Sequence, residues 1–232
     1  SMQDLMNEAY EAKIQTETFR LNQVEAEFKT LASQINPHFL YNTLETIRMK
    51  AYVNNDKETA DLVKKLGKFM RRCLEVKNSM VTLESELEFT KSYLELQSAR
   101  FGDRVSYSID NEIDGNYPIL PLIIQPIVEN AFVHGVESSK NNGRITVTIK
   151  YSGENVVIEV EDNGQGIPDD KMSELRWKLE ENDTSSGKSI GLTNVNKRIK
   201  MFHGDEYGLS FTSRIGKGTR VRITLPKEVK NQ

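Results

Sequence analysis

The chain has 232 residues, a formal net charge of −3 and a single cysteine. This length suits one large domain or two small ones, and the slightly acidic balance argues against nucleic-acid binding through a broad basic surface. One cysteine excludes an intrachain disulfide framework. The most apolar stretch, residues 118–128, is much shorter than the roughly 20 residues that span a bilayer. We therefore expect a folded chain that binds no nucleic acid and does not itself cross a membrane.

Glycine and proline are distributed unevenly along the chain. Thirteen of the fourteen glycines and five of the six prolines follow residue 100. Because both residues are costly inside helices, the first hundred residues are predicted to be helical. The remainder is predicted to be a turn-rich mixture of helices and strands, which makes the fold class α+β.

The amino-terminal segment carries an apolar stripe with the spacing of a coiled coil. The stripe advances in alternating steps of three and four residues, interrupted only by Glu17. This pattern predicts a dimeric coiled coil or bundle; the alternative is a single amphipathic helix that packs on its own domain. The stripe consists of Tyr10, Ile14, Leu21, Val24, Phe28, Leu31 and Ile35.

A helical hairpin is predicted next. Pro37 is expected to bend the first helix, and helical patterning then resumes to about residue 52. A turn at residues 54–56 leads into a second amphipathic helix at residues 57–76. Hairpins from two chains can associate as a four-helix bundle, and we expect that dimer here.

The rest of the chain alternates between helices and strands. A helix over residues 82–100 has Thr82 as its expected N-cap. Strands are expected at residues 105–109, 145–151, 156–161, 209–213 and 220–225, several of them with the period-two pattern of a sheet that has one solvated face. Further helices are expected at residues 121–136, 169–181 and 192–202.

Four short polar segments at predicted element ends can serve a nucleotide. An Asn amide oxygen on a helix can bind Mg²⁺, and a carboxylate at a strand end can accept a hydrogen bond from an exocyclic amine. Glycines let backbone approach a ligand closely, and a helix start offers free N–H groups to phosphate. The segments are Glu129-Asn130 with His134 one turn later, residues 161–166, residues 189–192 and residues 216–219.

In this order, the four segments resemble the N, G1 and G2 boxes and the terminal Gly-Thr strand of a known ATP-binding fold. This fold, the Bergerat or GHKL fold, is shared by sensor histidine kinases, DNA gyrase and MutL. Residues 34–44 are similar to the phospho-acceptor box of the LytS/YesM-like sensor histidine kinases, and residues 100–104 also look like that subfamily. The resemblance implies a two-layer α/β sandwich that binds ATP after the helical hairpin.

The resemblance also implies residue roles. His38 matches the phospho-acceptor, Asn130 the residue that binds Mg²⁺, and Glu129 its acidic neighbour. Asp162 matches the carboxylate that reads the adenine amino group. The other matched positions surround the nucleotide: His134, Gly164, Gly166, Ser189, Gly191, Leu192 and Thr219. Ser189 stands where the first G2 glycine is usual, and residues 169–189 correspond to the ATP lid.

The phospho-acceptor box departs from the common pattern at one position. Phe39 follows His38, where many sensor kinases have an acidic residue that can deprotonate the imidazole. Glu45 and Glu129 are therefore both candidates for the general base. Asn42, four residues after His38, could position the imidazole or a hydrolytic water; the alternative is an exposed polar helix residue.

The implied domains are a coiled-coil signalling helix at 1–31, a dimerisation and phosphotransfer hairpin at 32–79, and a catalytic ATP-binding domain at 80–232. The implied function is a homodimeric, Mg²⁺- and ATP-dependent histidine kinase that phosphorylates His38 and passes the group to an Asp of a response-regulator receiver domain. The alternative is a catalytically degenerate dimerisation and signal-relay module. We expect a cytoplasmic fragment whose full-length parent is a receptor in the cell membrane.

Overall fold

The computed structural model describes residues 37–74, 80–137, 142–180 and 190–229. The chain divides into two compact units, Ser1–Glu75 and Val76–Gln232. The predicted coiled coil of residues 1–31 lies outside the described residues, as does Ser189. Within the described ranges, no helix combines the length and the apolar character that a membrane crossing requires.

The first unit contains the predicted helical hairpin. Helix α2 (Pro37–Val53) packs against helix α3 (Lys57–Leu74). Asp56 caps α3, because its Oδ1 accepts a 3.0 Å hydrogen bond from the backbone N–H of Thr59. Several apolar side chains stay exposed in the single chain, namely Phe39, Ile47, Met49, Tyr52, Val53, Leu62 and Leu66.

The second unit is built on a five-stranded mixed sheet with the order β2-β4-β5-β7-β6. Strand β2 runs parallel to β4, and every other neighbouring pair is antiparallel. The strands are β2 (Val105–Asn111), β4 (Gly143–Ser152), β5 (Asn155–Asp162), β6 (Gly208–Arg214) and β7 (Gly218–Pro226). A short pair, β1 (Val81–Thr82) with β3 (Pro118–Ile119), lies apart from this sheet.

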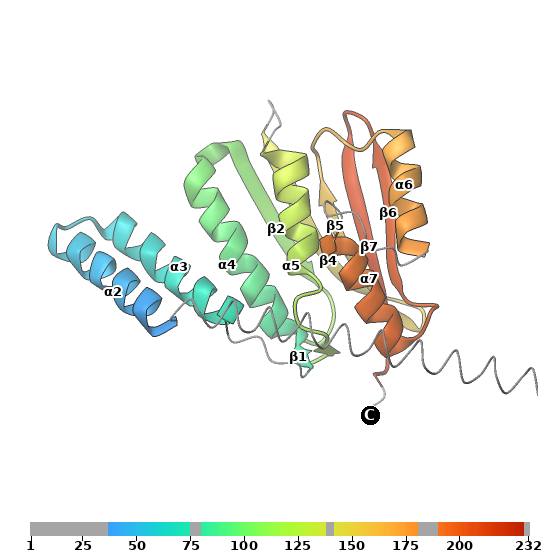
Figure 1. Cartoon of the computed structure of the whole chain (residues 1–232), viewed down its shortest axis with the longest axis horizontal. Coiled ribbons are helices and arrows are strands. Elements are labelled where there is room, and N and C mark those ends of the chain that lie inside the picture. Colours follow the sequence, from blue (N-terminus) through green and yellow to red (C-terminus); the bar gives the residue numbers. More distant parts are fainter. Residues whose placement is uncertain (1–36, 75–79, 138–141, 181–189, 230–232) are drawn as a thin grey trace, which may run out of the picture. The chain divides into compact units, whose positions relative to one another are not determined.

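One face of the sheet is covered by helices (Figure 1). Apolar rows cross the central strands beneath them: Ile149, Ile158 and Ile223 are register neighbours and all are fully buried. The covering elements are α4 (Leu83–Phe101), α5 (Gln125–Asn130), the π-helix η2 (Ala131–Val136), α6 (Asp169–Glu180) and α7 (Ile190–His203); a 3-10 turn η1 (Gly102–Arg104) joins α4 to β2. The predicted Thr82 N-cap is confirmed, since its Oγ1 accepts from the N–H of Ser85 at 3.2 Å.

The helix predicted over residues 121–136 differs from the structure in two ways. It begins only at Gln125, because Leu122 has φ +56°, in the left-handed region, and breaks the helical path. Its last six residues form a π-helix, in which the N–H of Glu137 donates to the C=O of Phe132 at 2.8 Å. The prediction was therefore wrong for residues 121–124.

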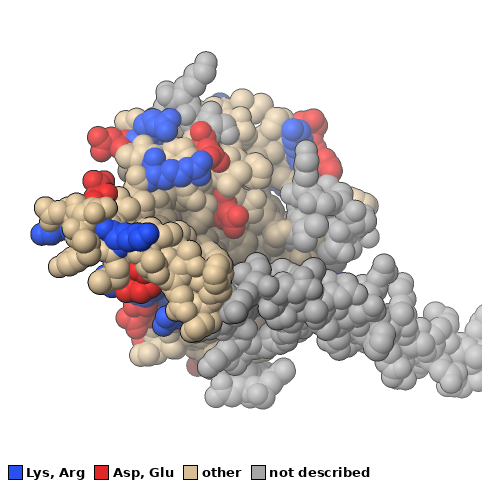
Figure 2. All heavy atoms as spheres, turned by 60° about the vertical axis from the view of Figure 1, so that its left-hand side comes forward, with Lys and Arg blue, Asp and Glu red and all other residues tan. Residues whose placement is uncertain are grey.

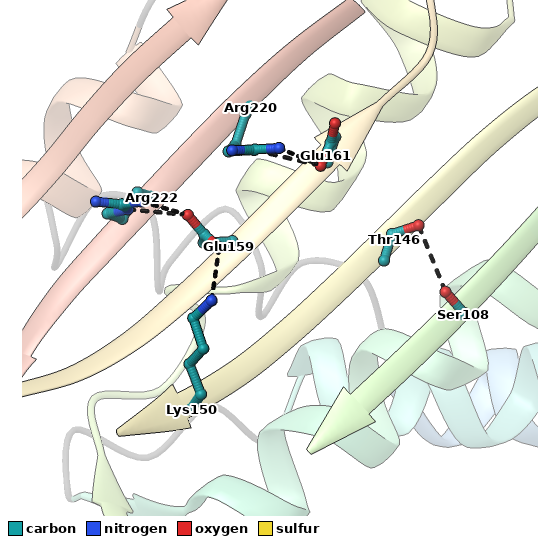
Figure 3. A network of polar contacts seen from close by, with 7 residues as sticks. All are labelled: Ser108, Thr146, Lys150, Glu159, Glu161, Arg220 and Arg222. Atoms are coloured by element: carbon teal, nitrogen blue, oxygen red, sulfur yellow. Dashed lines mark hydrogen bonds and ion pairs between the residues drawn. The ribbon is translucent and has the colours of Figure 1, made fainter. Parts of the chain in front are cut away.

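On the face shown in Figure 2, Lys and Arg side chains are interspersed among Asp and Glu. The uncovered sheet face carries ion pairs between neighbouring strands: Arg222, the register neighbour of Glu159, and Lys150, placed diagonally to it, flank Glu159, and Arg220 pairs with its register neighbour Glu161 (Figure 3). Although partial burial opposes it, the bond from Arg222 helps to hold the pKa of Glu159 below its usual value. Exposed pairs of this kind contribute at most about 1 kcal/mol each, so this face is a solvated surface and not a second core.

Candidate functional site

Asn130 ends helix α5, and its side chain is held in one orientation. The amide Nδ2 donates to the C=O of Pro126, one turn earlier, at 2.7 Å. Because the N–H is engaged, the Oδ1 atom is the group left to bind a cation. Mg²⁺ usually takes one or two protein oxygens together with phosphates and water, which a single amide oxygen suits. Glu129 is exposed beside it.

Asp162 ends strand β5 as a buried carboxyl group with an exposed fraction of 5%. Its Oδ1 accepts from the N–H of Gly164 at 2.8 Å. Burial raises the pKa of Asp162, and the backbone N–H groups of Gly164 and Thr219 partly oppose that rise. A buried carboxyl group needs donors, and the exocyclic amine of a purine would supply another.

Three glycines from three elements pack around Asp162 so tightly that no side chain fits. A Cβ on Gly135 would lie 2.5 Å from the Asp162 Oδ1, and one on Gly164 would lie 2.0 Å from the Gly135 carbonyl oxygen. A Cβ on Gly218 would lie 1.8 Å from the Asp162 backbone oxygen. We call Gly135, Gly164 and Gly218 the glycine cradle. The sequence analysis assigned Gly164 and included Gly218 in the segment 216–219. It did not assign Gly135, although a glycine inside a predicted helix was a usable signal.

The G1 loop is joined to the β6–β7 hairpin. Gly166 has φ +72°, and a Cβ there would lie 2.2 Å from the Arg214 carbonyl oxygen. The Ser213 hydroxyl accepts from the N–H of Ile167 at 2.8 Å and lies 2.8 Å from the Thr219 hydroxyl. These contacts place Gly166 and Thr219 near one another, and Ser213, which the sequence did not single out, connects them.

The same loop contacts the end of the N-box helix. The Gln165 amide donates to the C=O of His134 at 3.1 Å, and the His134 side chain is exposed. Asn163 holds the start of β4, because its Oδ1 accepts from the N–H of Arg144 at 2.6 Å and its amide donates to the C=O of Asn142 at 3.0 Å. Asn163 and Gln165 are further residues that the sequence motif alone did not assign.

The start of α7 has the open space that the cradle lacks. Gly191 is exposed, and a Cβ there would meet no described heavy atom within 4 Å. Leu192 is partly exposed, and the first turn has no acidic residue. The positive end of the α7 dipole therefore has no carboxylate from its own first turn and suits a phosphate group.

The range 169–189, predicted to be the ATP lid, begins with a helix. Residues 169–180 form α6, which buries Met172 and Leu179 in the domain. Asn196, only 1% exposed, donates from Nδ2 to the C=O of Leu179 at 3.1 Å and accepts at Oδ1 from the N–H of Leu209 at 2.8 Å. This part of the range is therefore anchored, and residues 181–189 lie outside the description.

His38 lies exposed in the first turn of α2. The Asn42 amide nitrogen is 3.3 Å from both ring nitrogens, so it can donate to whichever nitrogen carries the lone pair. Phe39, the next residue, is 66% exposed. The imidazole is therefore accessible within this unit, and Asn42 is placed to orient it.

The two candidate bases differ in their surroundings. Arg48 binds both carboxylate oxygens of Glu45, and this hydrogen bonding lowers the pKa of Glu45. A carboxylate with a lowered pKa is a weaker base. Glu45 is engaged by Arg48, and Glu129 is exposed beside Asn130.

Comparisons with known proteins agree with this arrangement. A family model described as histidine kinase matches residues 26–105, and one described as histidine kinase-, DNA gyrase B- and HSP90-like ATPase matches residues 115–229. The uncharacterized protein YwpD of Bacillus subtilis is 35% identical over 88% of this chain and 74% of its own length.

Two sensor proteins are similar over the same part of the chain. The sensor histidine kinase YesM of Bacillus subtilis is 36% identical over 87% of this chain and 33% of its own length. The sensor protein LytS of Oceanobacillus iheyensis is 37% identical over 87% of this chain and 34% of its own length. The present chain thus spans about a third of these relatives. It belongs to the histidine kinase family, among its YesM- and LytS-like members.

Proposed function

We propose that this chain binds Mg²⁺ and ATP on residues 80–232, transfers the γ-phosphoryl group to His38 and passes it on to an aspartate of a response-regulator receiver domain. One observation carries the proposal. The same chain holds an exposed histidine oriented by Asn42 and, in its second unit, a buried carboxyl group enclosed by the glycine cradle.

In this proposal each part of the nucleotide has a matching group. Asp162 accepts a hydrogen bond from the adenine amino group, and the tightly packed glycine cradle fixes the position of this carboxyl group. Thr219 lies at the edge of this adenine site, where its hydroxyl group contacts that of Ser213. The backbone N–H groups of Ser189, Gly191 and Leu192 donate hydrogen bonds to the phosphates. The exposed His134 is a further phosphate contact.

Asn130 would hold Mg²⁺ through its Oδ1, and the ion would neutralise charge on the phosphates. The transfer itself is a displacement at phosphorus. The His38 nitrogen that carries the lone pair attacks the γ-phosphorus, the bond from that phosphorus to the β–γ bridging oxygen breaks, and ADP leaves. Asn42 orients the ring before the reaction, and because its amide donates to the nitrogen that carries the lone pair, this hydrogen bond breaks as that nitrogen attacks. Glu129 is the candidate acceptor for the proton that the second ring nitrogen then loses.

The proposed partners follow from the exposed apolar side chains of the hairpin and from the relatives. We propose that two hairpins form a four-helix bundle, since Phe39, Ile47, Leu62 and Leu66 are left in solvent by the single chain. Because the chain spans about a third of YesM and LytS, we propose that it is the cytoplasmic portion of a longer membrane receptor.

The proposal is tested by incubation with γ-labelled ATP and Mg²⁺. Label that is stable to base and labile to acid is expected on the unaltered chain and absent from His38→Gln and Asn130→Ala. Asn116→Ala, an exposed asparagine in the loop before β3, is the matched control and should label normally. Label that survives His38→Gln would overturn the acceptor assignment, and ATP binding with no label on any chain would favour a degenerate relay module.

A further inference from the structure

A strained turn precedes the helix that carries Asn130. Leu122 has φ +56°, in a region that L side chains rarely adopt. Such a conformation costs free energy and persists only where the surrounding structure holds it. Two charged side chains from different helices hold this turn.

The first is Glu86, in the first two turns of α4, with an exposed fraction of 3%. Its Oε2 accepts from the N–H of Leu122 at 3.1 Å, and its Oε1 accepts from Ile123 at 3.0 Å and Ile124 at 3.1 Å. These N–H groups lie at the amino end of α5, where helical backbone has no internal acceptor and negative charge is favoured.

The second is Arg198 of α7, which binds the carbonyl side of the same turn. Its Nη2 donates to the C=O of Pro121 at 2.7 Å, and its Nη1 lies 3.5 Å from the C=O of Leu122. Opposite charges therefore bind the N–H and the C=O groups of one turn. Because α7 begins at the G2 box, this contact ties the N-box helix to the phosphate-binding end of the site.

The start of α4, where Glu86 lies, is also held by contacts outside α5. Strand β1, directly before α4, pairs with β3, and the N–H of Leu83 donates to the C=O of Tyr117 at 2.8 Å. Leu83 and Ile119 are both fully buried at this pair. The first turns of α4 are thus fixed to the segment that leads into the strained turn.

We propose that Glu86, together with Arg198, is a positioning residue that sets where α5 begins and hence where the Asn130 Oδ1 lies relative to the start of α7. The inference rests on the proposed function, because it assigns Mg²⁺ to Asn130. A six-residue helix behaves as a short rigid rod of about 9 Å, so a displaced start at Gln125 displaces Asn130 at its end. Glu86 itself touches no nucleotide in this account.

The test compares Glu86→Gln with Glu88→Gln, which makes the same change at an exposed site two residues along α4. Gln keeps the size of the side chain but turns an NH₂ group toward backbone donors. Two quantities are measured on the full chain: ADP affinity in EDTA, and the Mg²⁺ concentration that half-saturates the gain in ATP affinity. For Glu86→Gln we expect the Mg²⁺ requirement to rise about tenfold or more while ADP affinity in EDTA changes less than about twofold; Glu88→Gln should match the unaltered chain.

A Glu86→Gln chain whose Mg²⁺ requirement is unchanged would overturn the inference, as would equal weakening of both quantities, which indicates a merely structural role. If thermal unfolding shows that this variant does not fold, Arg198→Lys decides, since Lys keeps the charge but not the two-pronged donor. The Mg²⁺ requirement of Arg198→Lys should be higher than that of the unaltered chain, while its ADP affinity in EDTA stays the same. An unaltered chain that binds no nucleotide at all would instead contradict the proposed function.

Discussion

Asp162 occupies a place that favours its protonated form. Burial raises its pKa above the unfolded value of about 3.9, so the folded chain holds this proton more tightly than the unfolded chain does. The resulting stabilisation is complete below the unfolded pKa and is lost as the pH rises through the folded pKa. At neutral pH the buried carboxylate therefore lowers the free energy of unfolding, as expected of a group retained for binding.

Asp162→Asn should separate binding from stability. The amide oxygen can still accept from the N–H of Gly164, but the charge that would bind the adenine amine is gone. ATP affinity should fall by about 1.5–3 kcal/mol, roughly ten- to a hundredfold, while the free energy of unfolding at pH 7 is unchanged or higher. Calorimetric ATP titration and chemical denaturation measure the two. Asp110→Asn, on an exposed strand position, should change neither, and lower stability of Asp162→Asn would contradict the account.

The glycines of the site divide into two kinds with opposite expected outcomes. Gly164→Ala forces a Cβ to within 2.0 Å of backbone, whereas Gly191→Ala meets no described atom within 4 Å. The first should lose about 1–3 kcal/mol or more of unfolding free energy. Gly191→Ala should fold normally but bind ATP more weakly, because its Cβ would occupy the space in which we propose that the phosphates bind. Equal thermal stability of the two variants would argue against the cradle.

At the scale of elements, the alternating strands could be predicted from sequence because side chains on a strand point to opposite faces. Residues 145–151 and 220–225 show this: in the first segment Ile145, Val147 and Ile149 are buried, and threonine and lysine side chains alternate with them. The segments around Asp162 and Asn130 could be predicted because each has residues at a fixed spacing and lies at the end of a predicted strand or helix. Residues 121–124 could not be predicted, since the conformation of Leu122 depends on Glu86 and Arg198, which are distant in sequence. The same holds for Ser213 and Asn196, whose contacts exist only after folding.

The hairpin surface leads to a prediction about assembly. Leu66 is 36% exposed on α3, among the other apolar side chains left in solvent. Leu66→Glu should abolish the dimer, because a twofold interface would bring both new carboxylates into one apolar contact, and such juxtaposition costs several kcal/mol. Analytical ultracentrifugation should find monomers. Lys64→Glu, at an exposed polar position of the same helix, should remain dimeric, and a dimer of Leu66→Glu would exclude this surface as the interface.

At the scale of the whole molecule, the two units divide the chemistry between them. In the proposed function the hairpin supplies the nucleophile, the exposed His38, and the second unit supplies the nucleotide site around the buried Asp162. Under the proposed function, the phosphoryl group starts on ATP in the second unit and ends on His38 in the hairpin. The residue that carries this group after the reaction therefore tests the proposal.

The central claim is tested most directly by locating that group on the chain. After incubation with Mg²⁺ and ATP, peptide mass spectrometry at neutral to alkaline pH should find one phosphoryl group, on the peptide that contains His38, and none on that peptide from Asn130→Ala. A phosphoryl group on a serine or threonine would indicate a protein kinase of another class. Consumption of ATP with no phosphopeptide would indicate an ATPase, and either result would contradict the account.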